Sequence, residues 1–84
     1  MNWNYRIVRY PDGRAFALHE VYYDENGKPL AMTVDPATFV AVAEDSPETV
    51  IEALKMALKD AENSPVFDPP KEWFNKEGND EDHI

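Results

Sequence analysis

Apolar and polar residues alternate along the first part of the chain, as they do in half-buried β-strands. In residues 3–10 the large side chains of Trp3, Tyr5 and Ile7 fall on one face. Proline, aspartate and glycine follow at 11–13, a combination that favours a tight turn. We therefore expect a strand that leads into a hairpin.

A second strand is expected over residues 14–23, and its large apolar side chains point to both faces. Burial of this strand on both faces would explain the pattern, and so would a β-bulge near His19. The sequence leaves both explanations open.

Another turn is expected over residues 24–27. An Asn-Gly pair between two strand-like runs favours a two-residue loop with positive φ at both positions, here Asn26 and Gly27. A third strand should then cover 29–34. Residues 39–43 are apolar, and we expect them to form either a further strand or an arm that crosses the sheet.

A single helix is expected over residues 47–62. Ser46 is a suitable N-cap, and Pro47 and Glu48 suit the first turn. At about 100° per residue, one apolar stripe forms, which should face the sheet. The stripe consists of Val50, Leu54, Ala57, Leu58 and Ala61, with Ile51 at its margin.

These elements predict an α+β fold: an antiparallel sheet of three to four strands with one helix packed across it. The expected order is β-β-β-(β)-α, with room for a short final strand at 66–67. One domain should occupy residues 1–67, because 84 residues leave no room for a second. Residues 68–84 are acidic and contain prolines, so we expect a largely disordered C-terminal tail, from Asn75 onward in particular.

The net charge is −9, and its excess lies in the second part of the chain. Residues 1–34 contain four basic and four acidic residues, whereas residues 35–84 contain four basic and thirteen acidic ones. Such a surface repels nucleic acid and attracts a basic protein. The chain has no cysteine and no apolar run of membrane-spanning length, so we expect a cytoplasmic protein without membrane contact.

Recognisable catalytic groups are scarce. His19 and Glu20 are neighbours in a strand and point to opposite faces, so they cannot act together, and the other histidine, His83, lies in the tail. No calcium-loop or phosphate-binding glycine pattern occurs, and capping explains Ser46. We expect no enzyme activity, no cofactor and no bound metal. A small enzyme or metal protein that uses His19 is the alternative.

Partner contacts are expected from carboxylates of the acidic half, one methionine on the polar side of the helix and two aromatic residues of the tail. They are Glu44, Asp45, Glu48, Glu52, Met56, Asp60, Trp73 and Phe74. The leading hypothesis is a small prokaryotic or phage protein-binding module of antitoxin or inhibitor type, which docks a basic protein, and a homodimer is also considered. The alternative is a nucleic-acid mimic of anti-CRISPR or anti-restriction type, whose carboxylates replace phosphates.

The order of strand, Asp12-Gly13 turn, strand, extended segment and helix resembles the HicB-like antitoxins, which have a partial ribonuclease H-like fold. Residues 5–8, 12–13, 16–18 and 45–58 carry the resemblance. The family's Pro-Asp-Leu-Pro-Gly-Cys-like stretch is replaced by the hairpin at 26–27, and no segment corresponds to its C-terminal DNA-binding domain. The resemblance implies a non-catalytic, often dimeric sheet-and-helix scaffold for protein contacts, and because of these two departures neither toxin neutralisation nor operator binding is carried over to this chain.

Overall fold

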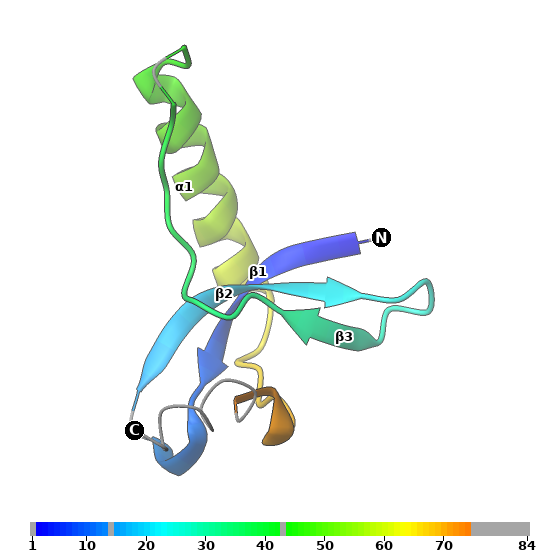
Figure 1. The fold of residues 1–84 in the computed structure, drawn as a ribbon. Helices are drawn as coiled ribbons and strands as arrows, with labels where there is room; N and C mark the ends of the chain where they lie inside the picture. Colours follow the sequence, from blue (N-terminus) through cyan, green and yellow to red (C-terminus); the bar gives the residue numbers. More distant parts are fainter. Residues whose placement is uncertain (1, 14, 43, 75–84) are drawn as a thin grey trace.

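The computed structural model describes residues 2–13, 15–42 and 44–74. Within these residues the chain forms one three-stranded antiparallel sheet, one α-helix and a short 3-10 helix, η1 (Pro11–Gly13), so the predicted α+β fold is confirmed (Figure 1). Among the described residues of the segment 39–43 no strand forms, and the chain there leads from the sheet to the helix.

The three strands follow one another along the chain. β1 (Asn2–Arg9) pairs with β2 (Phe16–Tyr23), and β2 pairs with β3 (Pro29–Met32). The helix α1 (Pro47–Asn63) comes after the sheet and starts where the sequence predicted. β2 is therefore the central strand, with a neighbour on each side.

β2 carries large side chains that are at least partly buried on both of its faces. His19 and Val21 are fully buried on one face, while Leu18 and Tyr22 are partly buried on the other. A register irregularity does exist, but it lies between Tyr22 and Tyr23 rather than near the histidine. Burial on both faces is thus the explanation that holds.

The turn between β2 and β3 differs from the predicted one. The N–H of Gly27 donates to the carbonyl of Asp24 at 2.9 Å, which makes Glu25 and Asn26 the two central residues of the turn. Gly27 follows them with a φ of 82°. The loop is longer by one residue than the predicted Asn-Gly loop because the Asp24 carboxylate accepts the N–H groups of Asn26 and Lys28, at 2.8 and 2.9 Å.

The outer edge of β1 is covered by the chain that follows the helix. The N–H of Phe67 donates to the carbonyl of Ile7 at 2.8 Å, and the N–H of Arg9 donates to the carbonyl of Phe67 at 3.0 Å. The short final strand that the sequence allowed is therefore a single parallel bridge, between Val8 and Phe67. This bridge satisfies backbone groups that an edge strand would leave open.

The start of α1 is stabilised differently from the prediction. Ser46 occupies the N-cap position, and Pro47 is in the first turn. The Ser46 hydroxyl makes no capping hydrogen bond, and instead the Ser46 carbonyl accepts the N–H of Thr49 at 2.9 Å. The predicted helix start is confirmed, but the predicted side-chain cap is wrong.

The helix does not lie flat on the sheet. The second half of α1 is hydrogen-bonded to β1, because the Asp60 carboxylate accepts the Tyr5 N–H at 3.1 Å. The first half of α1 projects away from the strands (Figure 1). The radius of gyration, 14.4 Å, exceeds the roughly 12 Å of a compact domain of this length. The core is correspondingly small, and the buried residues among those described are Tyr5, Val8, His19, Val21 and Ala57.

The described part of the predicted tail, 68–74, packs against the sheet. Its Trp73 ring meets Phe67 edge-on with centroids 5.8 Å apart, and its Phe74 ring lies 5.3 Å from that of Tyr10. The largely disordered tail was predicted over residues 68–84, and most of that segment, residues 75–84, lies outside the described residues.

Candidate functional site

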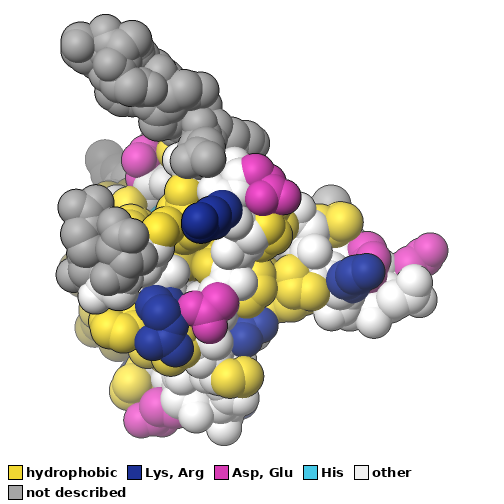
Figure 2. All heavy atoms as spheres, turned by 90° about the horizontal axis from the view of Figure 1, so that it is seen from below, with side chains coloured by type: hydrophobic (Ala, Val, Ile, Leu, Met, Phe, Trp, Pro, Cys, Tyr) yellow, Lys and Arg dark blue, Asp and Glu magenta, His cyan; other side chains and the backbone are white. Residues whose placement is uncertain are grey.

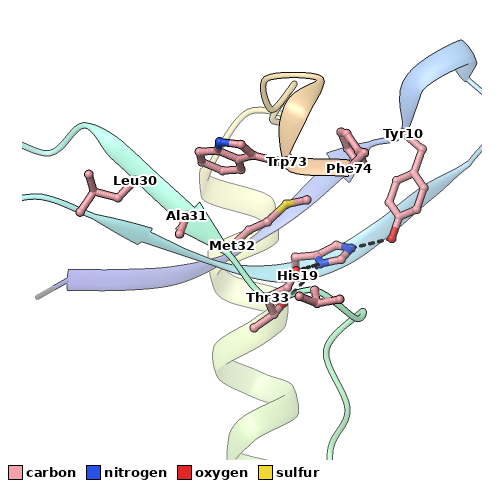
Figure 3. Close-up of a pocket in the computed structure, with 9 residues that line it drawn as sticks. Tyr10, His19, Leu30, Ala31, Met32, Thr33, Trp73 and Phe74 are labelled. Carbon is pink, nitrogen blue, oxygen red and sulfur yellow. Dashed lines mark hydrogen bonds between the residues drawn. The ribbon is translucent and has the colours of Figure 1, made fainter. Parts of the chain in front are cut away.

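A pocket of about 260 Å³ opens on the sheet face that the tail residues cover (Figure 3). β3 and the residues after it form one wall, the aromatic pair of the tail forms the other, and His19 lies at the floor. The lining residues are Tyr10, His19, Leu30, Ala31, Met32, Thr33, Val34, Trp73 and Phe74.

The His19 imidazole is fully buried, and both ring nitrogens have partners. Nδ1 lies 3.0 Å from the Thr33 carbonyl oxygen, which can only accept, so Nδ1 carries a proton and donates it. Nε2 lies 2.7 Å from the Tyr10 hydroxyl, which donates to it. Burial, aided by the Asp35 charge, raises the pKa of Tyr10, so this hydroxyl keeps its proton at neutral pH. The arrangement ties β2 to Tyr10, which follows β1, and to Thr33, which follows β3.

Both ring nitrogens of His19 are therefore engaged by groups of the fold itself. Its sequence neighbour Glu20 belongs to the opposite face and accepts a hydrogen bond from the Tyr22 hydroxyl at 2.6 Å. His83 lies outside the described residues. Within the described part of the chain, no three His, Asp or Glu side chains come together as a metal site requires. We find no assembled reactive centre around the described histidine.

The second candidate surface is α1, where half of the predicted core stripe is exposed. Ala57 is 4% exposed, whereas Ile51, Leu54 and Leu58 are 45%, 48% and 60% exposed. We call these three residues the apolar ridge. They lie about 60–120° around the helix from Ala57, since one residue turns the helix by about 100°. The prediction that the stripe faces the sheet is therefore wrong for its large members.

A small-residue seam explains why the helix sits this way. Ala53, Ala57 and Ala61 recur every four residues and point toward the covered side of α1, where short side chains allow close approach. The large side chains on the flank of this seam are then turned outward. The alanine spacing was visible in the sequence, and it is the signal that could have predicted the exposed ridge.

The carboxylates predicted to bind a partner are divided between two environments. Glu44, Asp45, Glu48 and Glu52 are all exposed, at the end of α1 that projects from the sheet or just before it. Asp60 is partly buried and already bonded to β1. The first four residues therefore remain available to a partner, and Asp60 serves the fold.

The other three predicted residues also lie apart from one another. Met56 is 44% exposed and sits about 140–160° around α1 from the apolar ridge. Trp73 and Phe74 are partly buried in the wall of the pocket. The structure thus does not gather the eight predicted contacts into one surface.

Charges of both signs mix over the rest of the surface. Figure 2, viewed from the end opposite the tip of α1, shows lysine and arginine side chains between carboxylates, with hydrophobic surface among them. Arg9 pairs with Asp68 at 2.8 Å, and Arg6 lies 5.0 Å from the centroid of the Phe67 ring. On α1 itself, two carboxylates of the first half are followed by Lys55 and Lys59. Neither surface presents the unbroken negative row of a phosphate backbone.

Comparison of the chain with protein-family models, with curated proteins and with solved structures finds no match. In the part of the chain that the structure describes, α1 is too short and too polar to cross a bilayer.

Proposed function

We propose that this chain is a small, non-catalytic protein-binding module that docks a partner through the projecting part of α1. The observation that carries the proposal is the apolar ridge. Three large apolar side chains at intervals of three and four residues form the pattern with which a helix enters an apolar groove of another protein. Single exposed apolar residues are ordinary, but an aligned set on a protruding helix marks an interaction surface.

The magnitude of the gain agrees with a docking role. Fully burying one such side chain stabilises by about 1.5–3 kcal/mol, so three side chains that are half exposed offer roughly 2–4 kcal/mol. Association itself costs several kcal/mol in lost freedom of motion, at least about 4. The ridge therefore needs further contacts around it, and charges are the available source.

The charges beside the ridge favour a partner with basic side chains. Glu44, Asp45, Glu48 and Glu52 are exposed on the same end of the molecule, without a basic residue among the positions 44–52. Carboxylates at the rim of an interface speed encounter and select the partner, and salt weakens their effect. We therefore expect complex formation to slow as the salt concentration rises.

The proposal treats the His19 pocket as part of the scaffold. A histidine whose two nitrogens are both bonded has a structural explanation, which supports a non-catalytic assignment. The antitoxin or inhibitor type, the prokaryotic or phage origin and the cytoplasmic location are part of the proposal and rest on sequence reasoning. No observation favours the nucleic-acid mimic, because lysines interrupt the acidic row of α1.

Two substitutions of matched exposure test the proposal. Leu54 is 48% exposed on the ridge and Met56 is 44% exposed on the other side of the same helix. Proteins captured from a bacterial extract by the immobilised chain would be identified and purified, and their affinity measured by calorimetry for wild type, Leu54→Lys and Met56→Lys. We expect Leu54→Lys to lose binding and Met56→Lys to keep it, with circular dichroism unchanged for both. Equal binding by the Leu54→Lys variant and wild type would refute the proposed surface.

A further inference from the structure

The exposed charges of α1 change sign halfway along the helix. Glu48 and Glu52 belong to its first half, and Lys55 and Lys59 follow in the second. All four side chains are exposed. At about 100° per residue they fall within one strip roughly 60° wide, which borders the apolar ridge on the side away from the covered face. One side of the helix therefore carries an apolar row next to a strip that is negative and then positive.

Such a surface is complementary to itself when a second helix runs in the opposite direction. With a two-fold axis at Ala53, Glu48 comes level with residue 58 of the copy and Glu52 with residue 54. Measured along the helix axis, each carboxylate residue is then offset by only about 1.5 Å from a lysine residue of the copy. Glu48 comes beside Lys59 of the copy, and Glu52 comes beside Lys55 of the copy. The same two-fold axis places Ile51 beside Leu54 of the copy, again with an offset of about 1.5 Å along the helix. Apolar and charged rows are matched together.

Other arrangements of two helices lose this match. A parallel pair that meets through the ridge places the two charged strips on opposite flanks, so no carboxylate meets a lysine of the copy. An antiparallel pair centred two or three residues later places Lys55 against Lys55 of the copy. Only the axis near Ala53 satisfies both the ridge and the charges.

The arrangement also has room. The contact of α1 with its own sheet lies at Ala57 and Asp60, whereas the proposed axis passes through the projecting part. From Ala53 to Asp60 the helix extends about 10 Å, so the two attachment points of a pair are about 20 Å apart. In one chain the first half of α1 projects from the sheet (Figure 1), so the two sheets of a pair lie at opposite ends of the paired helices.

We propose that the basic, apolar partner of α1 is a second copy of this chain, paired through antiparallel helices. This inference rests on the proposed function, since it names the partner of the same surface. In the pair, Ile51 and Leu54 of each copy become buried between the helices, and Glu48 and Glu52 of one copy face the lysines of the other. The homodimer is thus held by an apolar seam with an ion-pair strip beside it.

Sedimentation equilibrium of the full chain tests the pairing. We expect wild type to dimerise and Lys55→Glu to raise the dimer dissociation constant by about tenfold or more, because two attractions become repulsions. The double variant Glu52→Lys with Lys55→Glu exchanges the charges of one ion pair and should restore most of the affinity. Lys28→Glu makes the same change of charge at an exposed residue of the β2–β3 turn and should leave dimerisation unchanged.

A wild-type chain that stays monomeric at every concentration overturns the inference. So does a result in which Lys55→Glu and Lys28→Glu weaken the dimer equally, because general acidity and not the strip would then be responsible. These failures differ from that of the proposed function. If the chain is monomeric but Leu54→Lys abolishes its binding to another protein, the docking surface stands and the dimer is refuted. If the Leu54→Lys variant dimerises and captures other proteins as wild type does, both proposals are refuted.

Discussion

Replacing His19 with alanine should destabilise the fold strongly. The imidazole is fully buried, and its loss leaves the Thr33 carbonyl and the Tyr10 hydroxyl without their partner. A buried polar group left unsatisfied costs about 1–3 kcal/mol, and the cavity left by the ring adds to that, so the sum is about 3 kcal/mol. A chain of 84 residues has a stability of roughly 4–12 kcal/mol, and the change would remove a large share of it.

Urea unfolding followed by tryptophan fluorescence measures this loss. For a slope of about 1–2 kcal/mol/M, the midpoint of His19→Ala should fall by roughly 2 M with the slope unchanged. Tyr10→Phe is the matched control, since it removes one hydrogen bond and keeps the ring, and should cost about 1 kcal/mol. The two values separate the bonding of the histidine from the packing around it.

The opposite result would be informative. Residues kept for chemistry often reduce stability, so their removal leaves the protein equally or more stable. A His19→Ala variant that unfolds at the wild-type urea concentration would refute the structural role of this histidine. It would then favour the alternative in which His19 acts on a ligand in the pocket.

Three smaller changes test local features. Gly27→Ala should lower the free energy of unfolding in urea by about 1 kcal/mol, because φ is 82° at this position. An added Cβ meets nothing within 4 Å, so the backbone conformation is the whole cause of the loss. An unchanged free energy of unfolding would contradict the turn geometry. The N–H groups of Lys28 and Asn26 donate to the Asp24 carboxylate and hold its pKa below the usual value. The ionised carboxylate therefore stabilises the fold above pH about 4, and this contribution is lost as the pH falls through the pKa of the folded state. Asp24→Asn should flatten that acid limb. Burial raises the pKa of Tyr10, so its contribution is present below pH about 10 and is lost as the pH rises through the folded pKa, and Tyr10→Phe should reduce the alkaline loss of stability.

The sequence by itself determined the elements and their order. Alternation, turn residues and the Ser-Pro-Glu start are local signals, and the three strands and the helix lie close to the predicted positions because local backbone preference decides them. The register of the second turn did not follow from the Asn-Gly pair alone. The Asp24 carboxylate also binds the backbone N–H groups of Asn26 and Lys28, so the aspartate before the pair was a second local signal that shaped the turn.

Tertiary structure alone decided which apolar residues are buried. The same stripe of α1 was compatible with full burial, but α1 contacts the sheet through β1, and Ala57 is buried while Leu54 and Leu58 remain exposed. It also decided the role of His19, whose partners at Tyr10 and Thr33 come from positions that only the folded sheet brings near. Both outcomes depend on contacts between distant parts of the chain. A periodic pattern predicts which face of an element a side chain lies on, but it does not predict which residues pack against that face.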